Sequence, residues 1–133
     1  MRPFHIEIVT PDGLIFDGEV ESLLVRTDDG DVEILRGHAD FVASVGTGRA
    51  RLLVEGKEKF ASVSGGFLSI KDGEVKLVAI TFEFADQIDR LRAEKAKERA
   101  EEALKVAGDE RQERIAKAKL ARAISRINVA DLK

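Results

Sequence analysis

The residues best suited to hold a charged ligand lie at and after Glu83. Asp89 and Arg92 are three positions apart, so a helix through this segment places both on one face. If two helices follow and fold against each other, further arginines converge there, and guanidinium groups hold phosphates through paired, charge-assisted hydrogen bonds. Spacing alone favours ordinary surface ion pairs, and a ligand site stays open as the alternative interpretation. The further arginines are Arg99, Arg122 and Arg126.

No other set of residues suggests chemistry of its own. His5 falls in an expected strand and His38 in an expected loop, and neither has a second histidine at metal-binding spacing. The chain has no cysteine, which excludes disulfides, thiolate metal sites and cysteine nucleophiles. Neither a nucleophile elbow nor a phosphate-binding P-loop motif occurs. We therefore predict no catalytic residue and no metal site.

The 133 residues divide near position 84. All seven Phe, both Pro and ten of the eleven Gly come before it, whereas eleven Ala and one Gly come after. The first part carries nine basic and fifteen acidic residues, and the second part carries thirteen and ten. Such a change in propensity and charge predicts two units, 1–84 and 85–133, with different folds and partners.

Residues 1–84 have the pattern of short strands separated by turns. Phe4, Ile6 and Ile8 alternate with polar or smaller neighbours, as in a half-buried strand. A further apolar run covers 20–25, and Gly65-Gly66 is one of several expected turns between runs. Turn signals every 8–12 residues predict an antiparallel β-sandwich of eight to ten short strands.

Residues 85–133 are dominated by helix-forming residues. Asp86 is expected to be an N-terminal cap or a first-turn anion, and Gly108 followed by Asp109 predicts one break between two helices. So short a link predicts an antiparallel two-helix hairpin, and the whole chain is α+β. The expected seam is mostly methyl groups, which at about 0.8 kcal/mol per buried CH₂ closes the hairpin only weakly. Its members are Ile88, Leu91, Ala96, Ala100, Ala103 and Ala107 against Ile115, Ala118, Leu120, Ile124 and Ile127.

In these features the sequence resembles the ε subunit of bacterial F-type ATP synthases over essentially its whole length. The resemblance rests on the alanine-rich helical pair and on three short motifs. Two departures occur before His38, since the family commonly has Gly in place of Glu33 and Pro in place of Arg36. The motifs are Ile8-Val9-Thr10-Pro11, Ile34-Leu35 with Gly37-His38, and Val63-Ser64-Gly65-Gly66-Phe67.

The resemblance implies a non-catalytic rotor subunit of the central stalk, peripheral to the cytoplasmic face of the bacterial membrane. The sandwich then binds the γ subunit and the c-ring, with Asp31, Glu33 and His38 in the contact loop. The helical arm is retracted as a hairpin, or extends to the α and β subunits and inhibits ATP hydrolysis. Acidic residues interleave with the basic ones in the arm, so nucleic acid is not an expected partner.

Some bacillus-type members of this family bind ATP through a motif I/L-D-x-x-R-A, which Ile88, Asp89, Arg92 and Ala93 match. The resemblance thus implies ATP as a regulatory ligand that stabilises the retracted arm, with the need for Mg²⁺ left open. Glu83, Asp89 and the backbone near Ile88 and Ala93 would hold the base and ribose, and the arginines the phosphates. The alternative is a free-standing ATP sensor that does not travel with γ. The implied contacts are Glu83, Ile88, Asp89, Arg92, Ala93, Arg99, Arg122 and Arg126.

Overall fold

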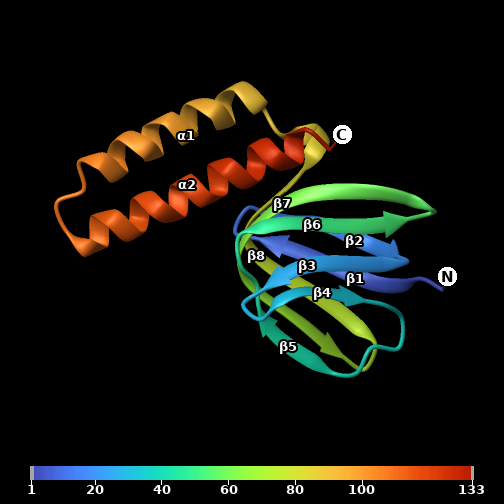
Figure 1. The fold of residues 1–133 in the computed structure, drawn as a ribbon. Coiled ribbons are helices and arrows are strands. Elements are labelled where there is room, and N and C mark those ends of the chain that lie inside the picture. The colour runs from blue at the N-terminus through green and yellow to red at the C-terminus, as the bar shows by residue number, and fades with distance from the viewer. Residues whose placement is uncertain (1, 133) are drawn as a thin grey trace.

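Eight strands fill the first part of the chain, and two helices follow (Figure 1). The computed structural model describes residues 2–132. The predicted α+β fold, a sandwich followed by a helical hairpin, is confirmed. The strands are β1 (Phe4–Thr10), β2 (Gly13–Val20), β3 (Ser22–Thr27), β4 (Gly30–Ile34), β5 (Phe41–Ser44), β6 (Gly48–Val54), β7 (Lys57–Lys71) and β8 (Glu74–Phe84).

The strands pair in the order β2-β1-β8-β7-β6-β3-β4, and β5 pairs with β7. Every pair is antiparallel except β1 with β8, which brings the first and last strands together in parallel. The sheet folds over a core in which Ile6, Ile8, Leu23, Leu52 and Leu77 are fully buried. Alternate residues of β1 point into this core, as the sequence pattern predicts.

β7 is one 15-residue strand, so the predicted turn at Gly65-Gly66 is wrong. Ahead of the glycines β7 pairs with β6, and beyond them it pairs with β5. Ala61 and Val63 point into the core before the glycines, and Leu68 does so after them, at 0%, 1% and 0% exposure. Val63 and Leu68 are an odd number of positions apart, whereas residues on one face of a regular strand are an even number apart. The strand therefore reverses its inward face at the glycine pair.

The strand expected over 20–25 is also displaced. Val20 ends β2, and β3 begins at Ser22. The segment 13–20 has no clean alternation, because Asp17 and Gly18 interrupt it, and its backbone pairing with β1 decides its structure.

The helical part begins with a short 3₁₀ turn, η1 (Ala85–Gln87), followed by α1 (Arg90–Lys105) and α2 (Glu110–Ala130). The cap of α1 is Asp89, whose carboxylate accepts a hydrogen bond from the Arg92 backbone N–H at 3.1 Å, whereas Asp86 is an acidic residue in the first turn of η1. The predicted break is confirmed: α2 starts after Asp109, whose carboxylate accepts from the Gln112 N–H at 2.8 Å.

The seam between the helices is narrower than the sequence pattern suggests. Ala93 and Ala100 of α1 and Ala116 and Ala123 of α2 are buried. The expected members Leu91, Ile115 and Ile124 are 62%, 42% and 39% exposed instead, and Ala103 and Ala118 are exposed too. Methyl groups therefore form most of the seam, which agrees with weak closure.

α2 lies between α1 and the sandwich and packs on β6 and β7 near its C-terminal end, while the turn between the helices points away (Figure 1). Ile88, Val129 and Ala130 form a small buried cluster with Ala85 at this junction. Within residues 2–132, neither helix has an apolar stretch long enough to cross a membrane.

An exposed histidine joins three strands on the outer surface of the sandwich. His5 of β1 contacts Glu74 of β8 at 2.7 Å and Asp17 of β2 at 2.5 Å. Hydrogen bonds to Glu74 and then Asp17 raise the pKa of His5 to about 9, against 6.5 for a free imidazole. The imidazolium therefore forms more readily in the folded chain than in the unfolded one.

This contact predicts a pH-dependent stability. The contribution of His5 is fully present below about pH 6.5 and disappears as the pH rises towards 9. Urea unfolding at pH 6 and pH 9.5 should show a lower free energy of unfolding at the higher pH. The part of this difference due to His5 should vanish in His5→Gln. An equal decrease in His5→Gln would assign the pH effect to other groups.

Candidate functional site

A groove of about 480 Å³ runs along the face shared by the two helices. It is lined by alanine side chains and by four cationic side chains, one from α1 and three from α2. The antiparallel hairpin brings these groups together although they are up to 27 positions apart in the sequence. The lining residues are Ala96, Arg99, Ala100, Ala103, Lys119, Arg122, Ala123 and Arg126.

The groove has an uncompensated positive charge. Of the described residues that line it, none is acidic. Within residues 2–132, Arg99, Lys119 and Arg122 form no ion pair, and the fourth groove cation, Arg126, pairs with Glu83 of the sandwich. Like charges held on facing helices repel each other, so the groove is suited to bind a polyanion that bridges the helices.

Arg126 is held from the sandwich by Glu83, at the end of β8. Its Nε donates to Glu83 Oε1 at 2.6 Å and its Nη2 donates to Oε2 at 3.0 Å. Both side chains are about one-third exposed, so this two-point ion pair is only partly screened by water. A predicted site residue from the sandwich and one from α2 thus meet directly.

The motif residues before and within the first turn of α1 have mainly structural contacts. Asp89 uses its carboxylate to cap α1, Ile88 is buried in the cluster at the junction, and Ala93 is buried in the helix seam. Arg92 is exposed and outside the lining of the groove, but it is seven residues before Arg99 and so lies on the same side of α1. The structure therefore unites Arg99, Arg122, Arg126 and Glu83, and leaves Arg92 beside them.

Lys119 is a groove residue that the sequence analysis missed. It is three positions before Arg122, so helical spacing already places the two on one face. That signal was available in the sequence, but the family motif does not include this position.

The three residues of the expected ring-contact loop do not form one cluster. Asp31 accepts from Arg26 Nε at 2.8 Å and lies beside α2, around a hollow that Asn128 also lines. Glu33 accepts from Arg51 at 3.4 Å. His38 lies beyond the far end of β4, where its ring contacts the ring of Phe41 edge-on at 5.6 Å between centroids. Their role in contacting a ring stays a prediction.

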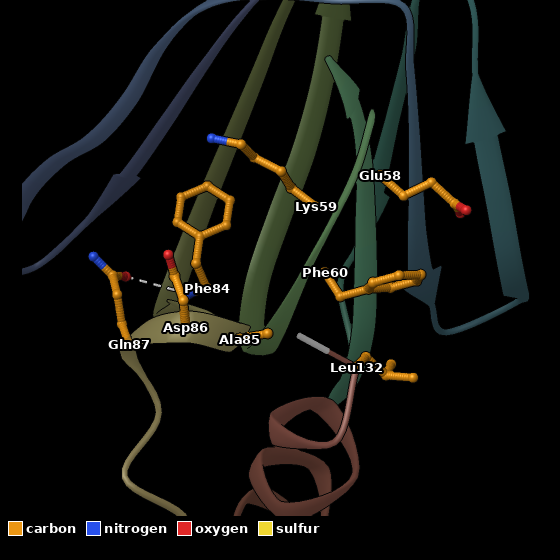
Figure 2. Close-up of a pocket in the computed structure, with 8 residues that line it drawn as sticks. All are labelled: Glu58, Lys59, Phe60, Phe84, Ala85, Asp86, Gln87 and Leu132. Atoms are coloured by element: carbon orange, nitrogen blue, oxygen red, sulfur yellow. Dashed lines mark hydrogen bonds between the residues drawn. The ribbon is translucent and has the colours of Figure 1, made fainter. Parts of the chain in front are cut away.

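A second hollow, of about 370 Å³, lies where β8 ends (Figure 2). Phe60 and Phe84 lie on either side of Ala85, and the Gln87 side chain accepts a hydrogen bond from the Phe84 backbone at 3.3 Å. Lys59 is accompanied there by two acidic residues, Glu58 and Asp86. Its balance of charge favours a polyanion less than the four cations of the groove between the helices do.

Apolar side chains also gather on the outer face of the sandwich. Phe67 is opposite Val78, Val78 is opposite Val9, and Val9 is opposite Leu14, which makes one row across β7, β8, β1 and β2. Ile80 is two residues beyond Val78 and on the same face. We call Leu14, Val9, Val78, Phe67 and Ile80 the outer row; Leu14, Phe67 and Ile80 are 59%, 45% and 63% exposed.

The comparisons with known proteins cover both parts of the chain. Residues 3–85 match the family model for the ATP synthase delta/epsilon chain β-sandwich domain, and residues 86–131 match the one for its long α-helix domain. The ATP synthase epsilon chain of Bacillus velezensis is 41% identical over 130 residues, with 98% of both chains covered. The epsilon chain of Shouchella clausii is 38% identical, covering 98% of this chain and 96% of its own.

Solved structures show the same fold at lower identity. A chain of the Euglena gracilis mitochondrial ATP synthase superposes with a TM-score of 0.81 at 24% identity, over 98% of this chain and 82% of that one. A chain of the Tetrahymena thermophila mitochondrial ATP synthase central stalk and c-ring gives 0.61 at 14% identity, over 95% of both. With both family models matched in order along nearly the whole length, the chain belongs to the ATP synthase delta/epsilon family, among the epsilon chains.

Proposed function

We propose that the chain is a non-catalytic rotor subunit in the central stalk of an F-type ATP synthase. In this proposal the sandwich attaches to the γ subunit and the c-ring, and the complex holds it at the cytoplasmic face of the membrane. The names of the relatives, which are ATP synthase epsilon chains, support the complex. The outer row supports attachment, because large exposed apolar side chains in one contiguous patch are typical of protein interfaces.

The helical hairpin is the regulatory part, and ATP is the ligand that keeps it closed. The observation that carries this proposal is the groove whose cations come from both helices and of which Arg99, Lys119 and Arg122 have no acidic partner among the described residues. A triphosphate in the groove neutralises Arg99 on α1 and Arg122 on α2 together, which favours the closed hairpin. Its volume, about 480 Å³, lies in the usual range for small-molecule sites.

A ligand that binds only the closed arm stabilises it by about 2.7 kcal/mol at a hundredfold excess over Kd. The methyl seam is weak, so a shift of this size is enough to change the resting position of the arm. Plentiful ATP then keeps the arm retracted. When ATP is scarce the arm opens, extends to the α and β subunits and inhibits hydrolysis.

Titration calorimetry of the isolated chain with ATP tests the site. Each of Arg99→Gln and Arg122→Gln should weaken ATP binding about tenfold, because each removes a charged hydrogen-bond donor. Lys97→Gln is the matched control: Lys97 is two residues from Arg99, on a different face of α1 and outside the groove. No heat up to several millimolar ATP, or equal affinity in all variants, would contradict the proposal.

A further inference from the structure

Two side-chain contacts join α2 to the sandwich at one place. The two residues that the sandwich contributes are adjacent to each other, and so are the two that α2 contributes. Ser62 and Glu83 are directly opposite each other on β7 and β8. Their partners Ser125 and Arg126 are consecutive in α2. The two serine hydroxyls are 2.8 Å apart, and the Glu83 carboxylate accepts twice from Arg126. We call these four residues the docking quartet.

The docking quartet defines one position of α2 on the sandwich. Ser62 and Ser125 are 5% and 8% exposed, so neither hydroxyl has ready access to water as a replacement partner. A shift of α2 by one residue rotates the helix by about 100°, which turns both partners away from the strands. The hydroxyl pair and the ion pair therefore form and break together.

Arg126 belongs to the docking quartet and to the groove at once. A guanidinium has five N–H donors. Glu83 engages the one on Nε and one on Nη2, which leaves both on Nη1 and one on Nη2. Arg126 is thus able to keep its bond to Glu83 while it donates to a ligand in the groove.

We propose that Glu83 is a positioning residue that fixes Arg126 in the groove and so links occupancy of the groove to docking of α2 on the sandwich. Glu83 then acts through Arg126 and does not itself hold the base or ribose. The part of this inference that concerns a ligand rests on the proposed function, whereas the docking part does not.

The docking part is tested without ligand by single-molecule energy transfer. The chain has no cysteine, so dyes attach only at introduced ones. Val42→Cys on the sandwich and Val106→Cys at the helix turn suit this purpose, at 72% and 76% exposure. Glu83→Gln and Arg126→Gln should each lower the ratio of docked to undocked arm about tenfold, and the double variant no further, since either change already breaks the pair.

Ser62→Ala separates the two contacts. It removes only the hydroxyl pair, so it should lower the docked ratio by itself and lower it again in Glu83→Gln. An unchanged docked ratio in Glu83→Gln, or equal and additive losses from Glu83→Gln and Arg126→Gln, would overturn the docking role.

The link to the groove is tested by calorimetry with ATP. Glu83→Ala should weaken ATP binding about tenfold in the wild-type background and have no further effect in Arg126→Ala. Additive losses would show a direct contact between Glu83 and the nucleotide, and would overturn the positioning role. If the wild-type chain binds no ATP, the proposed function fails and the ligand part falls with it, while the energy-transfer cycle still decides the docking part.

Discussion

Gly66→Ala should abolish cooperative folding at 25 °C. A Cβ at this position would lie 1.8 Å from the Val78 carbonyl oxygen and 2.8 Å from its carbon, both of which belong to the backbone of the paired strand. The backbone of Gly66 also has φ +106°, a conformation that residues other than glycine rarely adopt. Relief requires β7 and β8 to separate where the inward face of β7 reverses. We expect a loss above about 5 kcal/mol, which is comparable with the whole stability of a small domain.

Thermal unfolding followed by circular dichroism checks this result against Gly73→Ala. Gly73 has φ +82° in the turn between β7 and β8, but an added Cβ there meets no atom within 4 Å. Gly73→Ala should therefore lower the free energy of unfolding only by the strain of placing alanine in a left-handed backbone conformation, which is about 1–2 kcal/mol. A Gly66→Ala variant that melts cooperatively within a few degrees of Gly73→Ala would contradict the argument.

Phe67→Asp combined with Ile80→Asp should detach the subunit from the stalk. Both side chains project from the outer row into solvent, at 45% and 63% exposure, so the isolated chain should still fold. Central apolar anchors of an interface are worth about 2 kcal/mol or more each, and two buried carboxylates add a desolvation cost. We expect affinity for a γ-containing subcomplex to decrease at least about a hundredfold, measured by co-purification or surface binding.

The matched control for this experiment is Val106→Asp. It makes the same kind of change at an apolar residue that is 76% exposed, but at the helix turn rather than on the outer row. It should leave attachment intact. Equal retention of the double variant and wild type would move the γ-binding surface elsewhere, and failure of the wild-type chain to bind γ would favour the free-standing sensor.

Much of the fold could be predicted from local signals in the sequence. The errors of that prediction have a physical cause. Alternation identified β1, and Gly108 with Asp109 identified the helix break, because both depend on near neighbours. The parallel pairing of β1 with β8 joins segments about 70 residues apart, which no local pattern encodes. Gly65-Gly66 was predicted to be a turn because glycine tolerates the positive φ that many turns require. The two glycines also have positive φ inside β7, so the same property serves a different structure.

The site was predictable where helical spacing decides it and unpredictable where packing does. Arg99, Arg122 and Arg126 meet because their spacing puts them on facing sides of a hairpin. Asp89 caps α1, as a carboxylate just ahead of a helix does by accepting from a free backbone N–H, and its contact with a ligand stays a prediction. The Glu83–Arg126 ion pair depends on how α2 lies on the sandwich, which sequence does not reveal.

β7 is hydrogen-bonded to β6 over its first half and to β5 over its second, with β8 along its other edge. A strand that is paired in this way connects distant parts of the sandwich through one continuous backbone. In the proposed rotor, a force applied at Phe67 of the outer row passes along the backbone of β7, through Gly65-Gly66, to Ser62 beneath α2. β7 leaves β6 after Val63 and joins β5 at Phe67, so β8 is the neighbour whose pairing continues past the glycines. In the proposed rotor, a movement of the outer row should therefore reach the docked arm through the paired strands β7 and β8.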